Sequence, residues 1–112
     1  MLENYYVRPE TVDRIRCSWI VSAIEQYVGW MVEQRYTSRS VLHRVPFLVH
    51  FGEYAKAHEA SELTHLPEHV EPFVQAWVRE RARGRSSARV RKASQEVRNP
   101  ICQMLRLAVP GY

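Results

Sequence analysis

The residues best suited to chemistry are the basic side chains gathered near the middle of the second half of the chain. The stretch "RERARGRSSARVRK", residues 79–92, holds seven Arg and Lys residues against the single acid Glu80. Residues 79–98 together contain eight bases and two acids, a charge of +6, whereas the rest of the chain contains eight bases and ten acids, a charge of −2. Seven of the eight bases are Arg, whose planar guanidinium suits phosphate oxygens and guanine edges. Such a concentrated basic patch implies a polyanionic partner.

Two predicted helix starts add anion-binding groups to this charge. Ser86 or Ser87 is expected to cap a helix at the centre of the basic stretch, where backbone N–H groups and the helix dipole favour an anion. We expect the two starts to straddle a groove, one holding phosphates and one reaching base edges. The other start carries hydroxyl, guanidinium and imidazole groups at Thr37, Ser38, Arg39, Ser40, His43 and Arg44.

Other kinds of site find little support. His65 and His69 are four residues apart, but Pro67 separates them, and no cysteine or carboxylate trio completes a ligand set, so no metal site is predicted. No glycine-rich phosphate loop exists, and no nucleophile stands beside an obvious base. We therefore expect no cofactor and no catalysis by this chain. Cys17 and Cys102 are interpreted as reduced, buried small hydrophobes.

Composition places the chain among single globular domains. Its 112 residues are 46% hydrophobic and 11% aromatic, enough for a packed core. There is no run of 18 apolar residues for a membrane span, and the first ten residues, "MLENYYVRPE", lack the pattern of a secretion signal. A cytoplasmic location is expected.

Apolar periodicity predicts four helices and no strand. The first is expected over residues 9–34 and the second over residues 38–58, with a local distortion at Pro46. The third is expected to begin near Pro67, where Pro72 is tolerated only close to the helix start, and to end before Gly84. A fourth is expected to follow the serine cap and to run to about Ala108.

The inner and outer sides of the fourth helix are well separated in this pattern. One direction collects Val90, Ala93, Val97, Ile101, Met104 and Ala108. The opposite direction collects Arg85, Ala88, Arg89, Lys92, Gln95, Glu96 and Asn99. The basic side chains are thus predicted to point to solvent from a helix that is anchored by its other side.

Three stretches together carry a resemblance to a known family. The first, "YVGWMVEQRYTSRSVLHRVPFLVHFGEYA", is similar to an aromatic-rich helix end followed by a G-Y-S-x-x-T turn and a V-x-x-Y-x-x-x-L-x-x-F-x-x-W helix. The others are "ELTHLPEHVEPFVQAWVRER" and "SSARVRKASQEVRNPICQML". In order and spacing, over about residues 12–108, they resemble the core-binding domain of tyrosine recombinases, the phage-integrase family. Departures from its pattern include Arg35 at the usual glycine, Arg89 where Thr is common, and Pro46 and Pro100 inside helices.

The resemblance implies an all-α fold, a four- to five-helix orthogonal bundle often described as SAM-like. In that family the domain forms half of a C-shaped clamp on double-stranded DNA, with its second and fourth helices against the major groove. The chain is accordingly expected to be the DNA-binding domain of a site-specific recombinase or integrase. Its candidate DNA contacts are Arg39, Ser40, His43, Arg44, Arg85, Ser87, Arg89, Lys92 and Gln95.

The resemblance also divides the chain. Residues 1–11 would be an N-terminal extension, residues 12–108 the DNA-binding domain, and residues 109–112 the start of a linker. The family's catalytic Arg, His-x-x-Arg and Tyr belong to a second domain that would begin after Pro110, so Tyr112 is not a candidate nucleophile. Family members use neighbouring subunits on DNA, which implies homo-oligomers there, and we expect a monomer in free solution.

Two other functions remain open from the sequence. A helical protein-interaction module could bind an acidic partner through the same Arg residues. An enzyme with an unrecognised pocket is the least favoured, because no catalytic constellation is present.

Overall fold

The protein is described by a computed structural model that places the backbone of residues 9–112 and the side chains of residues 12–112. Within that range it contains five α-helices, one 3-10 segment and no strand, which confirms the predicted all-α class. The elements in chain order are α1 (Pro9–Arg16), α2 (Val21–Glu33), α3 (Ser38–Ala57), the 3-10 helix η2 (Leu63–His69), α4 (Val70–Arg81) and α5 (Ser87–Ala108).

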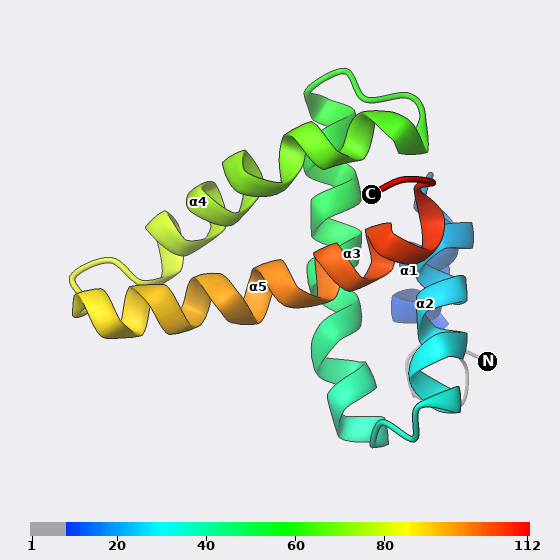
Figure 1. The fold of residues 1–112 in the computed structure, drawn as a ribbon, viewed down its shortest axis with the longest axis horizontal. Helices are drawn as coiled ribbons and strands as arrows, with labels where there is room; N and C mark the ends of the chain where they lie inside the picture. Colours follow the sequence, from blue (N-terminus) through cyan, green and yellow to red (C-terminus); the bar gives the residue numbers. More distant parts are fainter. Residues whose placement is uncertain (1–8) are drawn as a thin grey trace.

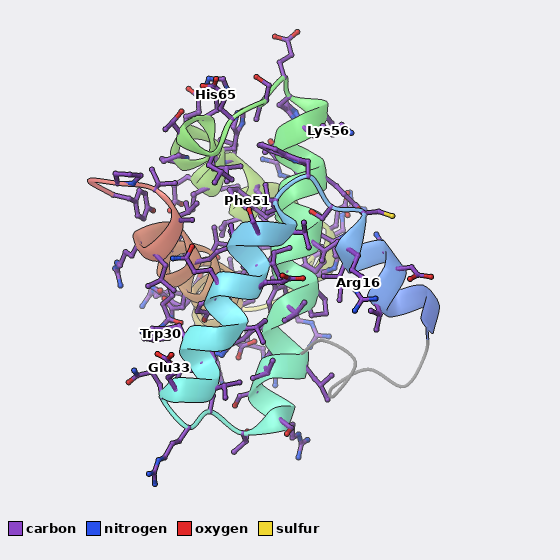
Figure 2. The ribbon with its side chains drawn as sticks, turned by 90° about the vertical axis from the view of Figure 1, so that its right-hand side faces the viewer. Arg16, Trp30, Glu33, Phe51, Lys56 and His65 are labelled. Carbon is purple, nitrogen blue, oxygen red and sulfur yellow. The ribbon has the colours of Figure 1, made fainter. Side chains whose placement is uncertain are left out.

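The helices form a body and a projecting hairpin (Figure 1). In the body, α2 and α3 run side by side, and α1 lies beside α3 at an inclination (Figure 2). The Arg14 guanidinium of α1 contacts the Glu53 carboxylate of α3 at 3.2 Å. Helices α4 and α5 cross α3 at a steep angle and meet at a short loop that points away from the body (Figure 1). We call the loop-proximal part of this hairpin, residues 75–96, the arm.

The predicted first helix is wrong in one respect, because the chain leaves helical geometry between α1 and α2. The Ser18 hydroxyl accepts a hydrogen bond from the Ile20 amide at 3.4 Å, and the Trp19 indole N–H donates to the Gly52 carbonyl oxygen at 2.8 Å. Ile20 is fully buried against Gly52, where an added Cβ would lie 2.9 Å from the Ile20 side chain. The break is therefore held by contacts with α3, which a local pattern does not reveal.

The third predicted helix also starts later than expected. The segment around Pro67 is 3-10 helical, and α4 begins only at Val70. This start places Pro72 in the first turn of α4, where a backbone N–H needs no helical acceptor. An α-helix from Pro67 would instead have put Pro72 in its second turn and cost a hydrogen bond.

Ser86, one of the two serines predicted as the cap of α5, is its cap, and Thr37 is the cap of α3. Thr37 Oγ1 accepts from the Ser40 amide at 3.1 Å at the start of α3, and Ser86 Oγ accepts from the Arg89 amide at 3.3 Å at the start of α5. Gly84 has φ +76°, the left-handed conformation that glycine adopts most easily, in the loop after α4. Both long helices continue past their internal prolines, and the proline of α5 is buried in the core.

One apolar core joins all five helices, and no polar or charged side chain is buried among the described residues. The inner side of α3 is buried at Val41, Val45, Leu48, Phe51 and Ala55. The largest fully buried side chains are Tyr27, Phe51, Ile20, Ile24, Met31, Leu48, Leu66, Ile101, Met104 and Leu105.

The two cysteines do not behave as predicted. Cys17 is exposed, because the break after α1 turns it to the surface rather than into the core. Cys102 is only half-buried, and its sulfur accepts a hydrogen bond from the Tyr112 hydroxyl at 3.3 Å.

Candidate nucleic-acid interface

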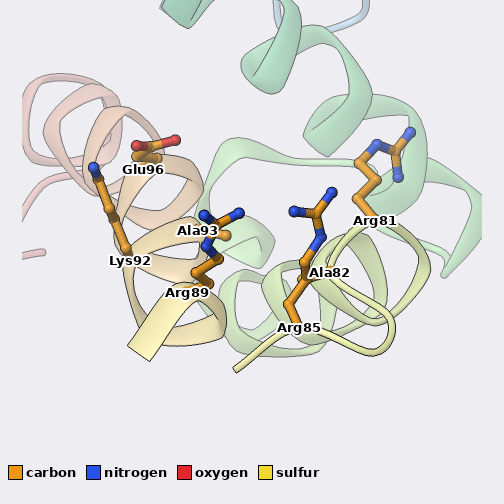
Figure 3. A pocket seen from close by; sticks show the side chains of 7 residues that line it. All are labelled: Arg81, Ala82, Arg85, Arg89, Lys92, Ala93 and Glu96. Carbon is orange, nitrogen blue, oxygen red and sulfur yellow. The ribbon is translucent and has the colours of Figure 1, made fainter. Parts of the chain in front are cut away.

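One side of the arm holds an open hollow of about 420 Å³ between the end of α4 and the start of α5 (Figure 3). Four cations and one carboxylate line it, which leaves a net charge of +3. The lining residues are Arg81, Ala82, Arg85, Arg89, Lys92, Ala93 and Glu96.

Helix geometry explains how these side chains come together. Arg89, Lys92 and Glu96 follow one another at spacings of three and four residues, so they occupy one side of α5. Arg81 comes from the last turn of α4, and Arg85 comes from the loop. Because that loop is short, the end of α4 lies directly across the hollow from the first two turns of α5 (Figure 3).

Arg81 is held in place by α4 itself. Its guanidinium lies 3.4 Å from the centre of the Trp77 ring, donates to the Trp77 carbonyl oxygen at 3.4 Å and pairs with Glu80 at 3.3 Å. Trp77 packs edge-on against Phe47 of α3. Arg81 therefore stands at the rim of the hollow in a defined orientation. Its place there was not predicted, although the Trp-x-x-x-Arg spacing on one helix face was a visible signal.

The other cations of the hollow are open to solvent. Arg85, Arg89 and Lys92 are exposed, and within residues 12–112 none of them forms an ion pair with a carboxylate. Because these side chains form no ion pair within that range and outnumber Glu96, the hollow keeps a net positive field for an anion that approaches from outside.

Arg98 belongs to the same basic segment but is already paired. Its guanidinium donates to both Glu71 carboxylate oxygens, at 2.6 and 2.9 Å, and so links α5 to the start of α4. These hydrogen bonds raise the pKa of Arg98 and lower the pKa of Glu71. Arg98 therefore contributes to the fold rather than to the open basic surface.

The start of α5 adds a helix N-terminus beside the hollow. Ser86 is its cap, and Ser87 is exposed at its first position. Among the predicted contacts on α5, Arg89 and Lys92 line the hollow, whereas Gln95 is exposed but lies outside the lining. The positive end of the helix dipole adds to the cationic field there.

The start of α3 divides its candidate residues between solvent and the fold. Arg39 and His43 are exposed, and Ser40 is half-buried beside the Thr37 hydroxyl, which lies 3.2 Å away. Arg44 is half-buried, and its guanidinium lies 5.1 Å from the centre of the Tyr36 ring. It is thus engaged within the fold.

Arg44 also lies near the buried Tyr27 hydroxyl. Burial raises the pKa of Tyr27, and the Arg44 guanidinium acts in the opposite direction. The Tyr27 hydroxyl donates to the Gln103 side-chain oxygen of α5. This cluster ties α2, α3 and α5 together, which gives Arg44 a structural task.

The two helix starts are not neighbours, contrary to prediction. The start of α3 lies at the lower end of the body, whereas the loop of the arm projects to the left in the same view (Figure 1). None of the α3 candidates lines the hollow. The two starts have similar residues, but α5 crosses α3 at a steep angle. The first turns of the two helices therefore lie in different parts of the molecule.

The histidines have ordinary local contacts. His65 Nδ1 accepts from the Ser61 amide at 3.3 Å, and His69 lies 3.5 Å from a carboxylate oxygen of Glu68. In the part of the chain with described side chains, no three His, Cys, Asp or Glu residues are grouped to hold a metal ion. None of the described helices is long and apolar enough to cross a membrane.

Comparison of the chain with protein-family models, with curated proteins and with solved structures gave no match.

Proposed function

We propose that this chain is the DNA-binding domain of a site-specific tyrosine recombinase or integrase and that it holds duplex DNA through the arm. In this proposal the domain is of the SAM-like core-binding type, works in the cytoplasm, is a monomer in free solution and meets neighbouring subunits on DNA. The catalytic residues would be supplied by another domain of the full-length protein.

The observation that carries the proposal is the basic hollow of the arm. Arg85, Arg89 and Lys92 surround it without carboxylate partners among the described residues, and Arg81 is fixed at its rim. Duplex DNA presents about one negative charge per 1.7 Å along its axis. A projecting surface that carries several open cations matches this partner better than it matches a small anion.

The chemistry of the cations supports phosphate contact as the main source of affinity. About six neutralised phosphates would make log K fall with log salt at a slope of roughly −5. Five of these contacts would come from the exposed side chains of Arg81, Arg85, Arg89, Arg91 and Lys92, and a sixth from the N-terminus of α5. Groove readout would be added by neutral side chains such as Ser87 and Gln95.

The experiment is a titration of a fluorescent 20-base-pair duplex, followed by anisotropy, at several salt concentrations. Arg89→Ala/Lys92→Ala is expected to weaken binding about tenfold at low salt and to make the salt slope less negative by roughly 2. The matched control is Lys56→Ala/Arg106→Ala, which removes the same charge from exposed sites outside the arm. It should leave the slope nearly unchanged.

Two results would contradict the proposal. One is an affinity for duplex that the Arg89→Ala/Lys92→Ala variant retains in full, with a flat salt response. The other is equal competition by polyglutamate at matched charge, which would favour an acidic protein partner.

A further inference from the structure

The arm has a second hollow, of about 470 Å³, that the proposed interface does not use. It shares Ala82 and Arg85 with the first hollow and adds two further arginines. Its lining consists of Gln75, Val78, Arg79, Ala82, Arg83, Gly84, Arg85, Val90 and Ser94.

The two hollows open on opposite sides of the hairpin. At roughly 100° per helical residue, Arg79 points about 160° away from Arg81 on α4. On α5, Val90 and Ser94 of the second hollow lie roughly 100–140° around the helix from Arg89 of the first. The plane that contains α4 and α5 thus separates a first side from a second side, and both sides are cationic.

The cations of the second side are also open. Arg79 and Arg83 are exposed, and neither has an ion pair among the residues that the structure describes. Gly84, in its left-handed conformation, follows Arg83 directly and lets the chain turn back toward α5. Arg83 therefore lies in the loop between α4 and α5, at the tip of the arm.

We propose that Arg79 and Arg83 bind a second phosphate strand, so that the arm contacts both backbone strands that border one groove of a duplex. This inference rests on the proposed function and extends it to residues on the other side of the arm. From one hollow to the other the arm is a single helix thick, about 10–12 Å with its side chains. The major groove of B-DNA is about 12 Å wide. Cations on the two sides of an arm of this thickness would therefore reach the phosphates of both strands that border the groove.

The second hollow is lined by three arginines and by no acidic residue, which favours a polyanion. A single nucleic-acid strand has one line of phosphates and would need only one side of the arm.

The test compares the two sides on two probes, the fluorescent 20-base-pair duplex and its labelled strand alone. Arg79→Ala/Arg83→Ala should weaken duplex binding about tenfold and reduce the magnitude of the salt slope by roughly 2. It should change single-strand binding less than twofold. Arg89→Ala/Lys92→Ala should weaken the binding of both probes. Arg79→Lys/Arg83→Lys keeps the charge and should restore most of the duplex affinity.

The outcomes separate this inference from the proposed function. If Arg79→Ala/Arg83→Ala binds duplex like the unmodified chain while Arg89→Ala/Lys92→Ala is weakened, the second-strand contact is wrong and DNA binding stands. If Arg79→Ala/Arg83→Ala loses as much affinity for the single strand as for the duplex, the second-strand contact is also wrong. If neither pair affects duplex binding, the proposed function fails as well. Thermal unfolding by circular dichroism identifies any variant that is weakened through its fold.

Discussion

At the scale of single residues, one side-chain type serves three purposes. Arg89 lies open at the hollow, Arg81 is stacked on an indole, and Arg98 is bound by a carboxylate. The difference lies in what the neighbouring elements offer, since all three come from one basic segment of 20 residues. Counting charges therefore overstates the binding surface, because a paired arginine contributes to the fold instead.

The Glu71–Arg98 pair predicts an acid-dependent loss of stability. The hydrogen bonds from Arg98 lower the pKa of Glu71 below its ordinary value of 4.5, so the folded state binds this proton less readily than the unfolded state. The contribution is therefore complete above about pH 4.5 and is lost as the pH falls through the folded-state pKa. Glu71→Gln should lower the unfolding free energy by about 0.5–1 kcal/mol at pH 7, a modest loss because Glu71 is half-exposed.

The measurement is urea unfolding of Glu71→Gln and the unmodified chain between pH 3 and pH 7. The difference between them should shrink at the acidic end of the series. Glu25→Gln, an exposed change on α2, is the control and should be near neutral throughout. A loss at Glu71 that does not depend on pH would show that packing, not the ion pair, is responsible.

At the scale of elements, α5 combines two tasks along its length. Its first turns present the basic hollow, and its burial begins at Val97 and continues through Ile101, Met104 and Leu105. The start of the helix is thus anchored only through the half-buried side chains of Val90 and Ala93. Its geometry depends more heavily on the cap at Ser86 and on the loop that joins it to α4.

The cap of α5 therefore predicts a difference between two adjacent serines. Ser86→Ala removes the acceptor of the Arg89 amide and should lower stability by about 1 kcal/mol. Ser87→Ala, at the first helical position, should change stability by less than about 0.5 kcal/mol. Thermal and urea unfolding of the two variants measure this difference. A larger loss of stability for Ser87→Ala would show that Ser86 is not the capping residue.

At the scale of the whole molecule, a compact body carries an arm whose free end is packed less closely against the core. The body buries the core of α2, α3 and the later turns of α5, whereas the residues that line both hollows are mostly exposed. Local openings should therefore cost less free energy in the arm than in the body. Such a division suits a surface that adjusts to a partner while the core stays fixed.

Hydrogen exchange followed by mass spectrometry tests this division. Amides of residues 90–94 should exchange faster than those of residues 101–105, because the first group lies on the arm and the second in the core. Duplex DNA should slow exchange mainly in the arm. Uniform protection along α5, or slowing confined to the body, would contradict the prediction.

The sequence by itself determined the features that depend on near neighbours. The all-helical class, the extents of α3 and α5 and the serine cap of α5 all follow from spacings of a few residues. Helical hydrogen bonds, caps and apolar periodicity act over about four residues, so a local pattern contains the information. The exposed state of Arg89 and Lys92 on α5 follows in the same way.

Only the tertiary structure decided where distant groups meet. The break before Ile20 depends on Gly52, and the pairing of Arg98 depends on Glu71 in another helix. The crossing of α5 over α3 separates the two helix starts that a sequence motif had suggested were neighbours, and the α4–α5 hairpin opens a cationic hollow on each of its sides. These outcomes depend on helix crossing and close packing between remote segments, which no spacing along the chain encodes directly.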